Sequence, residues 1–197
     1  MRIESVEAIP VCYPEPNDHN SQRYLCLARI RADDGQVGWG EAVTMWPEAS
    51  QATKAIIEGL SPLLIGQNPV ESEALWRRMR SHAWWYGVGG IASFAISALD
   101  IAIWDLKGKA LGSSVLDLLG GPVHERLPAM CSMHASHADL NEQAEEIAGW
   151  LAPGLHGVKV GLGKRGEARL GYEHDRDVEF IRVLRQAIGP EKRDGPR

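Results

Sequence analysis

The sequence predicts an α+β domain followed by about two βα units of a parallel sheet. Strand-like runs with alternating apolar residues open the chain, and apolar residues three to four positions apart follow from residue 48. After Pro122 the pattern changes to strand and helix in alternation, which is typical of parallel βαβ units. We therefore expect two domains, over residues 1–122 and 123–197.

The first three elements are expected to form an antiparallel meander. Its strands cover 3–11, 24–32 and 36–43, and residues 33–35 (DDG) form a tight turn between the last two. Residues 12–23 are polar, rich in turn-forming types and too long for a simple hairpin. We expect them to form a mobile loop, of the length that often serves as a lid.

Helical periodicity dominates the rest of the first domain. The expected helices cover 48–65, 70–85, 91–112 and, as a short element, 114–121. The third is apolar nearly all round in its first half, so it should be buried on more than one side, between two layers. Asp100 and Asp105 lie on it, and we interpret them as structural carboxylates because no partner acid, base or metal ligand stands near them in sequence.

The second domain is predicted to alternate strands and helices. The strands are 126–133 and 157–161, and the helices are 139–152 and 174–188. Asp139 and Glu142 fit the capping box at the start of the first of these helices.

Lys159 interrupts an apolar strand, and a buried charge is costly unless it has a role. Alternate residues of a strand face opposite sides, so Val158 and Val160 should face covering helices, whereas Lys159 and Gly161 face the other side. In a closed parallel barrel that side is the interior, beside the reaction mouth. Lys159 is therefore a candidate proton-transfer base, its pKa lowered by burial and nearby positive charge. The alternative is a lysine that extends to solvent from a strand end.

Glycines at 161, 163 and 166 spell GxGxxG directly after this strand, the fingerprint of a dinucleotide site. The fingerprint requires a helix that starts within the glycines and an acidic residue at the end of a second strand. Here Gly171 delays the helix, and Asp177 and Glu179 fall inside it. Dinucleotide binding is therefore the weaker alternative.

His134 and His137 follow the first strand of the second domain. As metal ligands they would need a third partner and a rigid frame, so surface histidines are the simpler interpretation, and lining of the reaction mouth is the alternative. We assign no metal ligand. GxSxG and HExxH motifs are absent, so nothing supports nucleophilic catalysis.

Composition narrows the class of partner. The net charge is −5, from 21 basic and 26 acidic residues without a basic run, which argues against nucleic acid and favours a small molecule. Three widely spaced cysteines fit a reducing cytosol rather than a disulfide frame. No apolar run approaches membrane-spanning length and no secretory signal opens the chain, so we expect a cytoplasmic protein without a membrane partner.

Three stretches, in this order, resemble the mandelate racemase/muconate lactonizing enzyme family of the enolase superfamily. They are GWGEA at 38–42, ASFAISALDIAIWDLKGKALGSSVLDLLGG at 92–121 and GVKVGLGKRG at 157–166. The resemblance implies an α+β capping domain (a three-stranded antiparallel meander plus helices), followed by an incomplete (β/α) barrel of about two βα units. It also implies that loops at 12–23 and about 44–49 close over the substrate, with Tyr13 and Trp46 as lid residues.

The resemblance implies a chemistry as well. Family members abstract a proton α to a carboxylate and stabilise the enediolate on Mg²⁺, as lyases or isomerases of the sugar-acid dehydratase, racemase or cycloisomerase type. The substrate would be a small carboxylate or sugar acid. The family's second barrel strand usually ends in Lys-x-Lys, and here Lys159 holds the first position and Gly161 the second. Lys164, in the loop beyond, is a further candidate for the reaction mouth.

The family takes its three acidic metal ligands from the third, fourth and fifth barrel strands and its opposing base from later ones. A full barrel needs roughly 200 residues or more, and the resemblance places only two strands in this chain. We therefore expect a truncated or frameshifted product that lacks the Mg²⁺ ligands and is inactive by itself. Open strand edges favour self-association or a homo-oligomer. The alternative is a non-catalytic assembly module that pairs through its open barrel edge.

Overall fold

The structure, a computed structural model, describes residues 1–16, 20–151, 154–163 and 167–189. The chain divides into two compact units: one comprises Met1–Glu15 and Asn20–Val123, and the other continues from His124. Within the described residues, no helix is long and apolar enough to cross a membrane.

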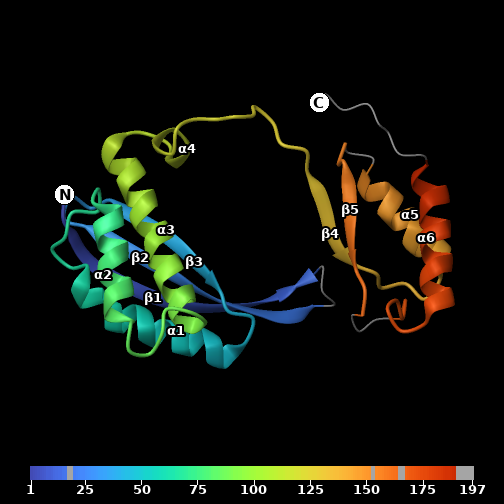
Figure 1. Cartoon of the computed structure of the whole chain (residues 1–197), viewed down its shortest axis with the longest axis horizontal. Coiled ribbons are helices and arrows are strands. Elements are labelled where there is room, and N and C mark those ends of the chain that lie inside the picture. The colour runs from blue at the N-terminus through green and yellow to red at the C-terminus, as the bar shows by residue number, and fades with distance from the viewer. Residues whose placement is uncertain (17–19, 152–153, 164–166, 190–197) are drawn as a thin grey trace. The chain divides into compact units, whose positions relative to one another are not determined.

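The first unit is built on a three-stranded antiparallel sheet in the order β1-β2-β3 (Figure 1). Its strands are β1 (Ile3–Glu15), β2 (Ser21–Ala32) and β3 (Val37–Val43). Alternate residues of β2 enter the core, where Cys26, Ala28 and Ile30 are fully buried. The predicted meander is confirmed, because this alternation commits one face of the sheet to the helices.

The expectation of a long loop over 12–23 is wrong. The β1–β2 pairing continues as far as Glu15 opposite Ser21, and Arg23 forms an ion pair with Glu15 across the two strands. β1 is an edge strand, the position in a sheet where proline residues such as Pro14 are tolerated. Most of this polar segment is therefore a hairpin rather than a loop.

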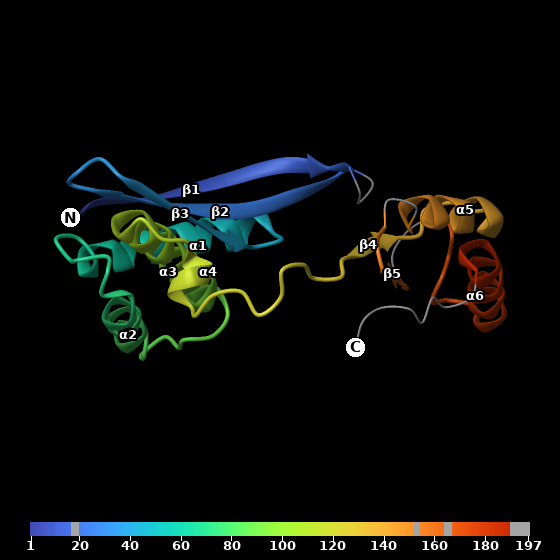
Figure 2. The ribbon, with the colours of Figure 1, turned by 90° about the horizontal axis from the view of Figure 1, so that it is seen from above.

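The helices of the first unit lie on one face of its sheet (Figure 2). They are α1 (Pro47–Leu60), a 3-10 turn (Ser61–Leu63), α2 (Ser72–His82), α3 (Ile91–Leu111) and α4 (Val115–Leu118). As predicted, α3 is buried on more than one side, since it contacts β2 and β3 as well as α1 and α2. Helices α1, α2 and α4 are shorter than the periodicity predicts.

Two glycines let α3 approach β3 closely. A methyl group at Gly38 would overlap the carbonyl oxygen of Ala102, and one at Gly40 would overlap that of Ala98. Both obstacles are helix backbone, which cannot rotate away. The glycines of the GWGEA stretch therefore set the distance between helix and sheet.

Asp105 joins the same two elements by hydrogen bonds. Its Oδ2 accepts from the backbone N–H of Trp39 at 2.9 Å and from Nζ of Lys109 at 2.7 Å. This is the structural role that the sequence predicts for Asp105. Asp100 lies five residues earlier on α3 and is half-buried. Burial is the main cause that raises the pKa of its carboxyl group, and the negative charge of Glu73 adds to it.

The second unit contains a parallel pair of strands with two helices. Its elements are β4 (Met130–His134), α5 (Leu140–Leu151), β5 (Gly157–Gly161) and α6 (His174–Ile188). The parallel βα pattern is confirmed. β4 begins later than predicted because it pairs along the full length of the short β5, from Met130 opposite Gly157.

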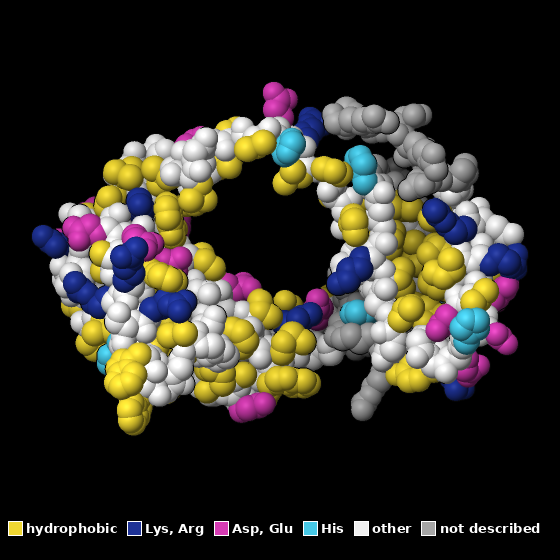
Figure 3. All heavy atoms as spheres, in the orientation of Figure 1, with side chains coloured by type: hydrophobic (Ala, Val, Ile, Leu, Met, Phe, Trp, Pro, Cys, Tyr) yellow, Lys and Arg dark blue, Asp and Glu magenta, His cyan; other side chains and the backbone are white. Residues whose placement is uncertain are grey.

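One core joins the strands and helices of the second unit, and Figure 3 shows apolar side chains gathered between β5 and the helices. Ile147 of α5 is fully buried and Phe180 of α6 is 1% exposed. Met133, Val158 and Val160 pack against this cluster from the strands.

Candidate functional site at the carboxyl end of the parallel strands

β5 divides its side chains between two faces, as its alternation predicts. Val158 and Val160 pack against the cluster formed with α5 and α6. Lys159 and Gly161 therefore belong to the opposite face, and the side chain of Lys159 is exposed. We call this side of the sheet the Lys159 face.

β4 contributes to the same face. Ser132 is paired with Lys159 and His134 with Gly161, while Met133 between them packs toward the helices. Because the strands are parallel, His134 and Gly161 both stand at the carboxyl end of the pair. Ser132, His134, Lys159 and Gly161 thus make up the Lys159 face.

His134 lies directly over Gly161. A methyl group at position 161 would overlap the imidazole of His134. Nδ1 of this ring is buried and has no hydrogen-bond partner among the described residues. The interpretation of His134 as a surface histidine is therefore wrong: it ends a strand and is half-buried. Strand register, which the sequence does not reveal, would have been needed to find this contact.

His137 occupies a different environment, in the loop after β4. Its Nε2 lies 3.5 Å from Glu146 and its Nδ1 3.9 Å from Glu142. The buried side chain of Gln143 accepts hydrogen bonds from the backbone N–H groups of Ser136, at 2.6 Å, and His137, at 3.0 Å. These contacts fix the loop and direct His137 to α5.

Asp139 caps α5 as predicted. Its Oδ1 accepts hydrogen bonds from the backbone N–H groups of Asn141 at 2.7 Å and Glu142 at 3.2 Å. These bonds favour the ionised form and hold the pKa of the Asp139 carboxyl below its usual value.

The first turn of α6 ties together the two loops that follow the strands. Arg176 donates to the carbonyl oxygens of Ala168 and Ala138, both at 2.6 Å. Asp177 accepts from the backbone N–H of Gly171 at 2.8 Å. Both contacts lie at the carboxyl end of the strands, so this end of the unit is held by α6.

Gly161 ends β5, and Gly163 does not lie in a helix. α6 begins at His174, well beyond the glycines, so its N-terminus is not placed where the dinucleotide fingerprint requires it. This geometry gives the dinucleotide alternative no support. Lys164 lies outside the described residues.

The described side chains of the Lys159 face do not fit a Mg²⁺ ion. Among the residues that the structure describes, no three His, Cys, Asp or Glu side chains come together as a metal-binding group. Mg²⁺ is held mainly by carboxylate and other oxygen ligands, and the Lys159 face offers a lysine and a histidine instead. The described residues of the Lys159 face therefore lack the donor chemistry of a Mg²⁺ site.

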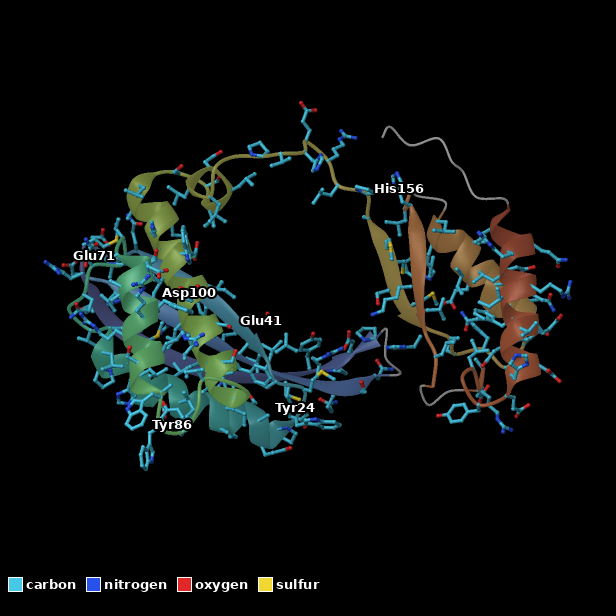
Figure 4. All side chains as sticks on the ribbon, viewed as in Figure 1. Tyr24, Glu41, Glu71, Tyr86, Asp100 and His156 are labelled. Atoms are coloured by element: carbon cyan, nitrogen blue, oxygen red, sulfur yellow. The ribbon has the colours of Figure 1, made fainter. Side chains whose placement is uncertain are left out.

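The two expected lid residues lie on the first unit. Tyr13 is a β1 residue opposite Arg23 and is 43% exposed. Trp46 immediately precedes α1 and is 63% exposed. The turn before it is anchored, because the backbone N–H of Met45 donates to the carbonyl oxygen of Tyr24 (labelled in Figure 4) at 3.1 Å. A role in closing over substrate stays a prediction for both residues.

Comparison with known proteins identifies the fold. Residues 17–120 match the family model described as mandelate racemase/muconate lactonizing enzyme, N-terminal domain. The chain belongs to this family. The resemblance inferred from the three sequence stretches is thereby confirmed.

Curated relatives of the chain carry sugar-acid names. The chain is 34% identical over 175 residues to D-galactarolactone cycloisomerase of Agrobacterium fabrum, a match that covers 87% of this chain and 43% of the relative. It is 43% identical over 105 residues to D-galactonate dehydratase of Verminephrobacter eiseniae, covering 53% of this chain and 26% of the relative. The chain thus matches less than half the length of either relative.

Solved structures extend the similarity to both units. The 3,6-anhydro-D-galactonate cycloisomerase of Zobellia galactanivorans has a TM-score of 0.80 at 29% identity, over 97% of this chain and 49% of that one. A mandelate racemase/muconate lactonizing protein of Paracoccus denitrificans, complexed with magnesium, has a TM-score of 0.79 at 33% identity, over 96% and 49%. The fold of this chain corresponds to about half of each.

Proposed function

We propose that this chain supplies the capping domain, residues 1–122, and the first two βα units, residues 123–197, of an enzyme that removes a proton α to a carboxylate. The substrate class is a sugar acid or a similar small carboxylate. Family membership and the names of the relatives support this proposal. The observation that carries it is Lys159, exposed near the carboxyl end of a parallel strand, on the face opposite the covering helices.

Lys159 has one of two roles in this proposal. As an ammonium group it attracts the substrate carboxylate, and as a neutral amine it accepts the α-proton. Burial in a closed barrel, with other positive charge nearby, would favour the second role. Among the described residues, no carboxylate lies within ion-pair distance of Lys159, so its charge is available to a ligand.

We further propose that the 197-residue chain alone neither binds Mg²⁺ tightly nor catalyses the reaction. The family reaction uses acidic ligands from the third to fifth barrel strands, and the described residues provide no such cluster. Tyr13 and Trp46 would then act only when the capping domain closes over a barrel that contains those ligands.

The test has two parts. The purified chain is incubated in D₂O with Mg²⁺ and a panel of sugar acids that includes D-galactonate and arabinonate, and α-proton exchange is followed by NMR. No exchange is expected. Exchange catalysed by the chain alone would overturn the claim of inactivity.

The second part restores a whole barrel. Residues 1–188 replace the corresponding part of the Agrobacterium fabrum cycloisomerase, and the same panel is assayed. We expect α-proton exchange by this chimera and its loss in Lys159→Met, with His156→Gln, at the opposite end of β5 (Figure 4), as the matched control. A folded chimera that exchanges no proton, or one that is insensitive to Lys159→Met, would contradict the proposal.

A second candidate function is a non-catalytic assembly module that pairs with another chain through its open barrel edge, and exposed apolar side chains favour it. They are Met130 on β4, Trp150 on α5, and Val178 and Ile181 on α6. Such side chains on strand edges and helix faces promote pairing with another chain. Light scattering should then show a dimer or larger species. A monomer that binds no hydrophobic dye would exclude this candidate.

A further inference from the structure

The absence of a side chain at position 161 is explained by the space that His134 occupies, not by the backbone conformation of Gly161. Gly161 has no positive φ, so any residue could adopt its strand conformation. The nearest atoms that a side chain there would meet all belong to the imidazole of His134. The glycine therefore provides the space that His134 occupies.

The two nitrogen-bearing side chains of the Lys159 face have no hydrogen-bond acceptor among the residues that the structure describes. Nδ1 of His134 is buried without a partner, and Lys159 has no carboxylate partner among the described residues. His137, only three residues later, is flanked by Glu142 and Glu146. Among the described residues, His137 therefore has carboxylates within ion-pair distance and His134 has none, although Glu146 lines the same pocket as His134.

A ligand with acceptor oxygens could contact the exposed ammonium group of Lys159 and the accessible part of the half-buried His134 ring, whose buried Nδ1 lies over Gly161. His134 is in register with Gly161, two residues beyond Lys159 on the same face, so an imidazole and an ammonium group stand in adjacent strands near their carboxyl ends. An imidazole donates a hydrogen bond from a ring nitrogen that carries a proton. A carboxylate accepts from both donors by charge-assisted hydrogen bonds.

We infer that His134 takes the place of a side chain at position 161 and, together with Lys159, binds a carboxylate-bearing ligand. This inference rests on the proposed function and assigns a second binding residue to that site. It also explains the departure from Lys-x-Lys: the second ionisable group comes from β4 rather than from β5.

The packing part of the inference is tested by a double-mutant cycle in the 197-residue chain. Gly161→Ala should displace the His134 ring and shift its Cε1–H NMR signal, with a lower urea midpoint for the second unit. In His134→Ala, the further change Gly161→Ala should cost much less, because the obstructing ring is gone. Equal effects of Gly161→Ala in both backgrounds would overturn the assignment of this space to His134.

The binding part is tested by NMR titration of the same chain with sodium D-galactonate at constant ionic strength. We expect a saturable shift of the His134 imidazole signal. His156, which precedes β5 at its opposite end (Figure 4), provides the internal control and should not shift. If galactonate leaves His134 unaffected, the inference is overturned, whereas the proposed function is judged separately by the chimera.

Two substitutions separate the contributions of the pair. Lys159→Met and His134→Phe should each weaken galactonate binding by about tenfold, the effect of one hydrogen bond to a charged group. Phe fills the space of the imidazole, and His134→Gln is a second variant in case Phe disturbs packing. His137→Gln should leave binding unchanged. Weakening by Lys159→Met alone would exclude His134 while leaving the role of Lys159 intact.

Discussion

In both sheets of this chain alternate residues face the helices, but the two sheets bury these residues to different extents. In the first unit, β2 places fully buried residues such as Ile30 against helices, and α3 lies on β3 at a distance set by glycines. In the second unit, Val158 and Val160 face the helices but are only half-buried. Alternation thus determines which face meets the helices, but the length and number of strands determine how much apolar surface is buried.

The smaller core should depend most on its largest side chain, so Phe180→Ala is expected to have the largest effect. Phe180 is 1% exposed, and removing a buried phenyl ring costs about 3–5 kcal/mol. Hydrogen exchange measured by mass spectrometry should show faster exchange in α5, β5 and α6 and unchanged exchange in α1 and α3.

Val178→Ala provides the matched control on the same helix. Val178 is 55% exposed, so its truncation should change stability by no more than about 0.5 kcal/mol. Faster exchange throughout both units in Phe180→Ala would show that they unfold together, and the comparison of two separate cores would fail.

The close approach of α3 and β3 is tested by Gly40→Ala. The new methyl group would overlap the carbonyl oxygen of Ala98, and overpacking of this kind costs about 1–3 kcal/mol. The urea midpoint of the first unit should fall. Gly59→Ala is the control, because Gly59 lies exposed in α1 with nothing near its added methyl group, and alanine there should stabilise the helix by about 0.5–1 kcal/mol. Similar effects of the two substitutions would show that the close approach does not limit packing.

Local signals in the sequence predicted β5 and α6 of the second unit best. The bounds of β5 and α6 were predicted to the residue, because β5 begins and ends with a glycine and the first turn of α6 is acidic. The cap at Asp139 was predicted for the same reason, since its acceptor bonds reach only two and three residues ahead. Such features depend on neighbours in sequence.

Features that depend on register were not predicted. The continuation of the hairpin to Glu15 and Ser21 was missed because proline and polar residues indicate a loop, whereas edge position and a cross-strand ion pair permit a strand. The contact of His134 with Gly161 joins two strands across a helix, and no local pattern encodes it. The predicted site was therefore incomplete where its residues come from different strands.

The smallest expected effect concerns the cap of α5 and its pH dependence. The pKa of Asp139 is lowered in the folded chain by the N–H groups of Asn141 and Glu142, so its ionised form stabilises the fold. This contribution is present above the unperturbed pKa of 3.8 and is lost as the pH falls through the lower folded value. Asp139→Asn keeps an acceptor oxygen but no charge, so α5 should exchange slightly faster than wild type at pH 7, and the difference should vanish at acidic pH. Glu145→Gln, an exposed change on the same helix, should show no such dependence, and a pH-independent difference between wild type and Asp139→Asn would contradict a role for the charge.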